Sequence, residues 1–503
     1  MLLPLAAPPP VPVGAPAVPA AADPLPDLDA ATIPQLARRM DAGSLTSVEL
    51  TRAYLRRIDT VDRGVRSVLA VDPEALRQAA ESDRRRARGQ ARGLMDGIPV
   101  LLKDNIDTRS GGTAGSRALR VPPRDDAELV RRLREAGAVV LGKTNMSEWG
   151  NFRSPWSTSG WSGVGGQTNN PYVLDRNPCG SSSGSGAAVA ASLAQVAVGT
   201  ETDGSIVSPA GQSGVVGFKP TLGRVSGDGI VPISTHQDTA GPMARHVVDA
   251  AILMSVLEGG GADYAAALTP DALRGARVGV WRRAGFSAET DRVVESAVDV
   301  LRRNGATVVE VELSHLDRID AAERSALVTE FKHDLEAYLR TRPGVPQTLT
   351  ELIAFNEADP VELSRFGQEL FHEAEKAPPI TDPTYREQRR TATDLARRSI
   401  DEVLAAHRLD VVMAPTNSPA WRTDYTGDPF GLSSAKPAAV AGYPNATVPA
   451  GFAGPLPIGV SFMAGHGADA RVLRFAAAFE RAAPVRRAPA YLPTLPGVTG
   501  CGS

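Results

Sequence analysis

Two short loops of small residues bring serine hydroxyls and glycines together in the middle of the chain. The first reads Gly-Ser-Ser-Ser-Gly-Ser-Gly over residues 180–186, and the second reads Gly-Thr-Glu-Thr-Asp-Gly-Ser over residues 199–205. Glycine tolerates backbone dihedral angles that other residues avoid, so such loops can bring backbone N–H groups close to a ligand. The two loops therefore predict a site built from hydroxyls and main-chain donors.

Several familiar kinds of site do not fit these loops. No Lys-Ser or Lys-Thr pair follows residues 180–186, as a phosphate-binding loop would require. The seven histidines are scattered, and none forms a His-x-x-x-His pair or has an obvious serine partner. Glu330 and Glu369 each precede a histidine by three positions, His333 and His372, which is the spacing of a carboxylate-bridged di-metal site. Because both pairs lie in charged helical segments, we interpret these histidines as structural, and Cys179 beside the first loop as a packing residue.

The lysines suggest a base other than histidine. Only six of the 54 basic residues are lysine, and a desolvated lysine can lose its proton whereas arginine cannot. Lys103 ends the apolar stretch at residues 97–103, where burial would lower its pKa and leave a neutral amine able to accept a proton. A single lysine is more often a solvated surface charge, and we expect Lys143 and Lys219 to be loop or surface residues.

The elements that must position these residues follow an α/β pattern. Residues 187–198 are apolar and uncharged and predict a buried helix between the two loops, with Ser185 as its cap. A capping box at Thr46 opens a helix, and helical and strand patterns alternate from there on. We expect helices at 73–88, 127–136, 289–303 and 470–483, and strands at 97–103, 138–141, 277–281, 307–313, 411–415 and 458–463. Residues 316–405 read mainly as helices, a helical cap beside the sheet.

Composition describes an ordinary globular protein of 503 residues with a formal net charge of −3. This balance gives no bias toward nucleic acid or an anionic membrane, and no run of about 20 apolar residues suggests a spanning helix. Nine prolines within residues 1–29 predict a disordered tail, either the remnant of a secretory signal or a plain extension. Localisation thus stays open between secreted or periplasmic and cytoplasmic. We expect one domain over residues 30–490 and a flexible tail at 491–503.

These strings resemble the amidase signature family of serine hydrolases. The resemblance covers residues 32–483 and includes the Lys-Asp-Asn context of Lys103, the loops at 180–186 and 199–205, and the Val-Gly-Phe-Lys-Pro-Thr string at 216–221. In that family a strand-end lysine, the first serine of a Gly-Ser-Ser string and a second serine 24 positions later form a Ser, cis-Ser, Lys triad. Lys103, Ser181 and Ser205 match this pattern.

The resemblance implies a mechanism and a fold. Ser205 would be the nucleophile, activated by proton transfer through Ser181 to neutral Lys103. The backbone N–H groups of Thr202, Asp203, Gly204 and Ser205 would bind the oxyanion, without a metal or organic cofactor. The implied fold is a large mixed twisted sheet covered by helices on both faces, in a single domain with a helical cap region.

The resemblance also bears on the substrate. Family members that act on small acidic substrates, including the glutamine-handling subunit of tRNA amidotransferases, tend to have arginine two positions beyond the nucleophile, where this chain has Val207. Residues 199–207, 228–234 and 238–245 are more similar to bacterial peptide amidases. We therefore expect hydrolysis of the C-terminal carboxamide of peptides by a monomer or homodimer, in a groove lined by residues 150–180, 228–240 and 421–434. The alternatives are a broader aryl or aliphatic amidase and a non-catalytic or partner-dependent member of the same fold.

Overall fold

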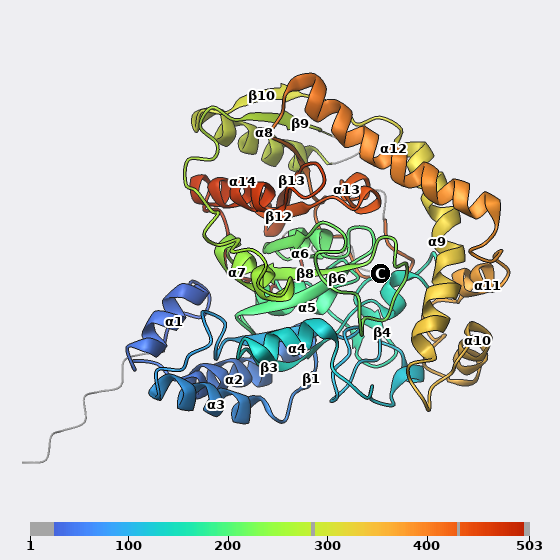
Figure 1. Cartoon of the computed structure of the whole chain (residues 1–503), viewed down its shortest axis with the longest axis horizontal. Coiled ribbons are helices and arrows are strands. Elements are labelled where there is room, and N and C mark those ends of the chain that lie inside the picture. Colours follow the sequence, from blue (N-terminus) through green and yellow to red (C-terminus); the bar gives the residue numbers. More distant parts are fainter. Residues whose placement is uncertain (1–24, 283–286, 430–432, 497–503) are drawn as a thin grey trace, which may run out of the picture.

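The computed structural model describes residues 25–282, 287–429 and 433–496 (Figure 1). Its centre is an eleven-stranded mixed sheet, and a separate two-stranded ribbon is formed by β4 (Trp161–Ser162) and β5 (Gly166–Gln167). In their order across the large sheet the strands are β1 (Val68–Val71), β3 (Val139–Thr144), β2 (Pro99–Lys103), β6 (Val196–Glu201), β8 (Thr239–Ala244), β7 (Val216–Lys219), β12 (Asn445–Ala453), β13 (Leu456–Met463), β11 (Val411–Pro415), β9 (Arg277–Val280) and β10 (Thr307–Glu310).

The part of the sheet that matters for the site is parallel. Strand β2 pairs in parallel with β3 on one side and with β6 on the other. All three are fully buried and rich in valine, leucine and alanine, as expected of strands covered on both faces. Their carboxyl ends therefore meet at one edge of the sheet, where ligand sites of such sheets form.

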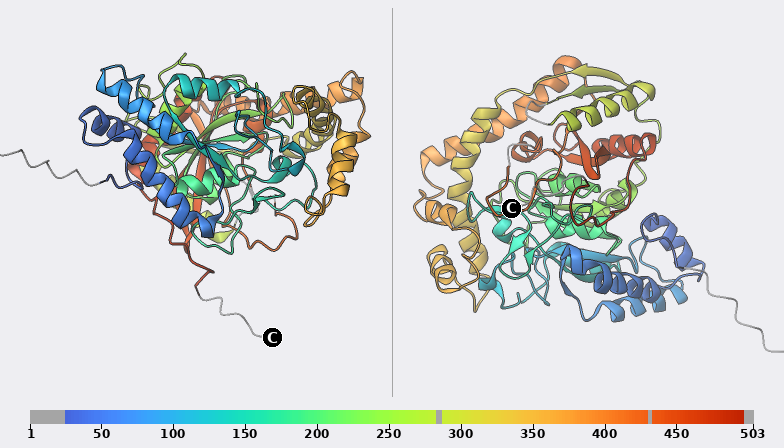
Figure 2. Two further views of the ribbon diagram at one scale, coloured as in Figure 1. Left: turned by 90° about the horizontal axis from the view of Figure 1, so that it is seen from below. Right: turned by 180° about the vertical axis from the view of Figure 1, so that it is seen from behind.

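Helices cover both faces of the sheet and leave a large apolar core between the layers (Figures 1 and 2). The capping box predicted at Thr46 is present, because its side chain and that of Glu49 accept from each other's backbone N–H. The helices outside the cap are α1 (Ile33–Asp41), α2 (Ser47–Val65), α3 (Ala75–Ala87), α4 (Glu128–Glu135), α5 (Ser183–Ala190), α6 (Val207–Gln212), α7 (Val247–Leu257), α8 (Ala288–Arg303), α13 (Lys436–Ala441) and α14 (Asp469–Ala482).

The segment predicted as a helical cap forms four helices along one flank of the molecule, yellow to orange in Figure 1. They are α9 (Leu316–Leu339), α10 (Leu349–Ala358), α11 (Glu369–Glu375) and α12 (Pro383–His407). Phe331, Leu335 and Phe371 pack in a second apolar cluster with Met146 and Trp149, which follow β3. The cap thus packs directly against the chain that follows the carboxyl end of β3.

The predicted helix over residues 187–198 is wrong in its second half. Helix α5 spans Ser183–Ala190, and the same apolar run continues as strand β6 after a turn at Ser192, whose φ is 53°. Apolar periodicity cannot distinguish a buried helix from a buried strand, since every face is covered in both. Ser185 is also not the cap, because it lies inside α5 and donates to the carbonyl of Val198 at 3.1 Å.

Two lysines expected in loops or at the surface lie in buried strands. Lys143 lies in β3 and Lys219 ends β7, and both side chains sit in the interior near carboxylates, of Asp104 and Glu201 respectively. Burial lowers the pKa of both, and that of Lys219 falls to about 8. Desolvated lysine is thus more frequent in this chain than the sequence indicated.

The predicted tails lie partly outside the described residues, which begin at Leu25 and end before residue 497. The carboxylate of Asp29 contacts Ser192 and lies 3.5 Å from Arg486. Near the other end, the backbone N–H groups of Tyr491 and Leu492 donate to the carbonyls of Pro171 and Tyr172 at 3.1 Å. Within the described ranges, no helix combines the length and the apolar character that crossing a membrane requires.

Candidate active site

Lys103 lies at the carboxyl end of β2, beside the end of β6. Its Nζ is 2.7 Å from Ser181 Oγ, 3.1 Å from the carbonyl oxygen of Thr200 and 2.9 Å from Thr200 Oγ1. The side chain is 1% exposed. A neutral amine has two N–H donors and one lone pair, so it can donate to both oxygens of Thr200 while its lone pair accepts the Ser181 hydroxyl proton.

The surroundings of Lys103 favour that neutral form. Burial lowers the pKa of Lys103 to about 7, although the carboxylates of Asp238 and Glu201 partly oppose this shift. Neither carboxylate makes a direct ion pair with the amine, since its hydrogen-bond partners are a hydroxyl, a carbonyl and a second hydroxyl. An amine with this pKa can both take and return a proton near neutral pH.

Ser181 is held at the start of α5 by a tight backbone. The Gly180–Ser181 peptide bond is cis, as the resemblance implied. A side chain at position 180 would not fit, because a Cβ there would lie 2.1 Å from Ser147 Oγ.

The serines expected to be structural are indeed structural: Ser182 Oγ donates to the carbonyl of Thr200 at 3.0 Å and Ser183 Oγ to that of Cys179 at 2.6 Å. Cys179 is buried, which raises the pKa of its thiol to about 12.

Ser205 lies beside Ser181 but its hydroxyl is not engaged. The backbone N–H of Ser182 donates to the carbonyl of Ser205 at 3.2 Å, which ties the two loops together. Ser205 is half-buried, and no hydrogen bond joins its hydroxyl to that of Ser181 or of any other residue within the described ranges. Hydrogen bonds between catalytic groups are often long before substrate binds. The side chain is therefore available to an incoming ligand.

The residues expected to form the oxyanion hole present free donors. Among the residues that the structure describes, none accepts a hydrogen bond from the backbone N–H groups of Thr202, Asp203, Gly204 or Ser205. Gly204 has φ of 80°, a left-handed conformation that favours glycine. Unpaired main-chain donors in such a turn form a concave anion-binding surface.

The side-chain carboxylate of Glu201 holds the two ends of the second loop together. Glu201 is 1% exposed, and its Oε2 accepts from the backbone N–H groups of Ile206 at 2.8 Å and Val207 at 3.0 Å. Its carboxylate therefore ties the start of the loop to its end. On the far side, Thr202 Oγ1 donates to Asp238 Oδ1 at 2.5 Å, and burial raises the pKa of Asp238 to about 7.

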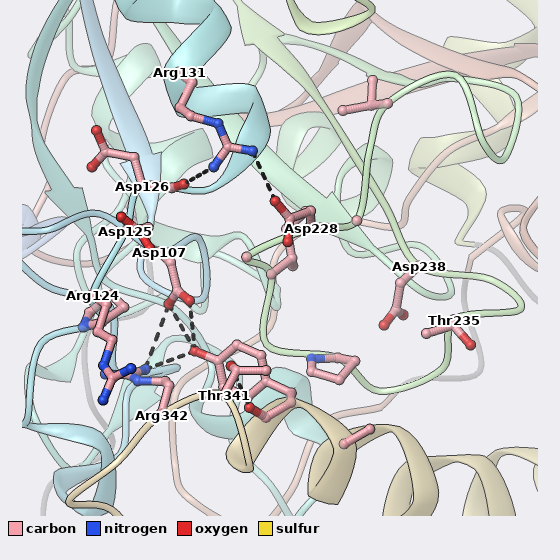
Figure 3. A pocket seen from close by; sticks show the side chains of 18 of the residues that line it. Asp107, Arg124, Asp125, Asp126, Arg131, Asp228, Thr235, Asp238, Thr341 and Arg342 are labelled. Atoms are coloured by element: carbon pink, nitrogen blue, oxygen red, sulfur yellow. Dashed lines mark hydrogen bonds and ion pairs between the residues drawn. The ribbon is translucent and has the colours of Figure 1, made fainter.

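The cavities around the site divide the groove expected from the sequence. A cavity of about 710 Å³ reaches Gly180 and Gly204 and is lined by Trp421 and Pro429. A larger cavity of about 1140 Å³ lies along residues 222–238, and neither Ser181 nor Ser205 lines it. In Figure 3, Arg131 bridges Asp126 and Asp228 across its wall, and Arg342 faces Asp107. Of these two cavities, the smaller one reaches the glycines that precede Ser181 and Ser205.

Sequence reasoning missed two residues that contact the expected triad and its loop. Thr200 binds Lys103 through two oxygens, and Asp238 holds Thr202. Thr200 lies in the predicted loop, so its contact with the lysine follows once β2 and β6 are known to be neighbours. Asp238 lies 33 positions after Ser205, in the segment 228–240 expected to line the groove, but no pattern in the sequence predicts its contact with Thr202.

Comparison with known proteins identifies the family. The amidase family model matches residues 49–473. A probable amidase of Arabidopsis thaliana is 36% identical, over 92% of either chain, and the glutamyl-tRNA(Gln) amidotransferase A subunit of Roseiflexus castenholzii is 37% identical, over 90% of this chain and 95% of that one. The native peptide amidase from Stenotrophomonas maltophilia is 48% identical, with a TM-score of 0.88 over 92% of this chain and 99% of that one. The chain therefore belongs to the amidase signature family, and the protein is an amidase.

Proposed function

We propose that the enzyme hydrolyses the C-terminal carboxamide of peptides through an acyl-enzyme formed on Ser205. The observation that carries this proposal is the 2.7 Å contact between Ser181 Oγ and the buried Nζ of Lys103, whose pKa is lowered to about 7. A neutral amine in contact with a serine hydroxyl is the base that a second serine needs, because the hydroxyl can pass one proton on while receiving another.

Proton transfer in the proposed reaction runs through both serines. Ser205 Oγ attacks the carboxamide carbon, its proton moves to Ser181 Oγ, and the Ser181 proton moves to Lys103 Nζ. The free N–H groups of residues 202–205 stabilise the oxyanion, and losing one such donor costs about 100- to 1000-fold in rate. Collapse breaks the C–N bond, and Lys103 returns the proton through Ser181 to the leaving ammonia. Water then hydrolyses the ester by the same relay.

The choice of a peptide substrate rests on similarity and on space. The 48% identity to a peptide amidase extends over nearly the whole of that chain. Position 207 holds a buried valine, so an arginine clamp for a substrate carboxylate is missing there. The cavity of about 710 Å³ beside Gly180 and Gly204 has room for an acyl group of several residues.

Ammonia release from peptide amides, measured against the matched free acids, tests this function. We expect release from the amides, and we expect Ser205→Ala to abolish it while peptide binding persists. Turnover of aryl or aliphatic amides alone would replace the substrate proposal and leave the mechanism standing. Activity that appears only with added partner proteins, as would suit the amidotransferase relatives, would contradict an independent amidase.

A further inference from the structure

We propose that Glu323 of the cap helix α9 is a positioning residue for the oxyanion loop, which we define as residues 202–205. This inference rests on the proposed function, because it assigns Glu323 to the reaction that this loop serves. The two oxygens of the Glu323 carboxylate each hold one side chain, Gln237 and Lys436, and each of these holds one residue of the loop.

The first arm of this arrangement runs through Gln237. Its Nε2 donates to Glu323 Oε1 at 2.8 Å and to the carbonyl oxygen of Thr202 at 3.2 Å. Its Oε1 accepts from Arg389 Nη1 of α12 at 2.6 Å. Because a carboxylate can only accept and a guanidinium can only donate, these partners fix which end of the amide faces the loop.

The second arm runs through Lys436 at the start of α13. Its Nζ contacts the other oxygen of Glu323 and lies 3.0 Å from Asp203 Oδ2 and 2.8 Å from Asp320 Oδ1. Lys436 thus joins three carboxylates, one on the oxyanion loop and two on α9. Without its charge, these carboxylates would repel one another and move Asp203 away from the cap.

The position of Glu323 makes it the point where both arms meet. Its side chain is 1% exposed, so it is held by packing as well as by its two partners. The two arms reach consecutive residues, Thr202 and Asp203, whose backbone N–H groups have no acceptor among the described residues. Catalytic donors act only when held to a fraction of an ångström, and a displacement of about 1 Å costs on the order of 100-fold in rate.

Kinetics with a peptide amide and two inhibitors separate this role from a merely structural one. A peptide aldehyde forms an adduct on Ser205 whose oxygen occupies the oxyanion position, whereas a peptide alcohol, with CH2OH in place of the carboxamide, has neither a charge nor a carbonyl oxygen for the oxyanion donors. We expect Glu323→Ala to lower kcat about 10- to 100-fold with KM changed less than about threefold. The inhibition constant of the aldehyde should rise by a similar factor, and that of the peptide alcohol should stay unchanged.

Two further variants keep the test decisive. Glu323→Gln preserves the volume of the side chain should the alanine variant fail to fold, and we expect the same pattern at smaller amplitude. Arg324→Gln is the matched control, because Arg324 is the next residue of α9 and pairs with Glu373 of α11 at 3.1 Å rather than with the loop. It should keep wild-type kcat.

The outcomes distinguish this inference from the function on which it rests. If wild-type enzyme is active, Ser205→Ala is inactive and both Glu323 variants keep wild-type kcat, the positioning role is wrong and the proposed function stands. A loss that affects the peptide alcohol and the aldehyde equally would also overturn it. If wild-type enzyme releases no ammonia or Ser205→Ala is active, the proposed function fails and the inference fails with it.

Discussion

Two lysines near the oxyanion loop show how the surroundings of an amine decide its charge. Lys103, at the end of β2, is surrounded by neutral oxygens of Ser181 and Thr200. Lys436, at the start of α13, contacts the carboxylates of Asp203, Asp320 and Glu323.

Burial lowers the pKa at both positions, but the outcomes differ. At Lys103 the effect of burial dominates and gives a pKa of about 7. At Lys436 the neighbouring carboxylates outweigh the effect of burial and raise the pKa above the ordinary value of lysine. The first amine is therefore suited to proton transfer and the second to permanent ion pairing. Residue type alone does not separate these two roles.

Replacing each lysine by arginine should give the largest difference in activity between the two positions. Arginine keeps the positive charge but cannot lose its proton. We expect Lys103→Arg to lower kcat/KM about 1000-fold or more, close to the effect of Lys103→Ala, since general base catalysis is worth about 100- to 10,000-fold. Lys436→Arg should stay within about threefold of wild type. Steady-state ammonia release measures both, and an active Lys103→Arg enzyme would rule out Lys103 as the base.

The pH dependence of the rate should follow Lys103 and not Lys436. Below its pKa of about 7 the base is protonated, so kcat/KM should fall about tenfold per pH unit there and level off above it. Asp238→Asn removes a nearby negative charge that raises this pKa, so it should move the midpoint to lower pH. The midpoint of kcat/KM against pH is the measurement, and a midpoint near 10 would contradict a neutral amine at neutral pH.

The stability of the fold should depend more on Lys436 than on Lys103. Lys436→Met leaves three carboxylates without their shared cation, and breaking a buried pair costs about 3 to 5 kcal/mol, less for a side chain that is 28% exposed. Lys103→Met removes a desolvated amine that makes no direct ion pair. In urea unfolding at pH 7 we expect Lys436→Met to be less stable than Lys103→Met by about 2 kcal/mol. Equal stabilities would mean that the carboxylates rearrange or protonate at little cost.

Much of the site could be predicted because it lies in contiguous strings. Lys103, Ser181 and Ser205 each stand in a recognisable local context, and the alternation of elements predicts the α/β sheet. The prediction for residues 187–198 is wrong in its second half because apolar residues suit a buried helix and a buried strand equally well. The contacts among Gln237, Glu323 and Lys436 join three segments that lie far apart in the sequence. Side-chain contacts of this kind leave no periodic pattern in any of the three segments.

In the proposed mechanism, Ser205 can attack the amide carbonyl near pH 7 only if Lys103 is neutral at that pH. A measurement of the charge of this amine is therefore the most direct test. With only six lysines in the chain, NMR of enzyme labelled with ¹³C-lysine can follow each side chain against pH, and the signal missing from Lys103→Arg identifies Lys103. We predict a titration midpoint near 7, in line with the lowered pKa. A Lys103 signal that stays in its charged form up to about pH 10 would contradict the account.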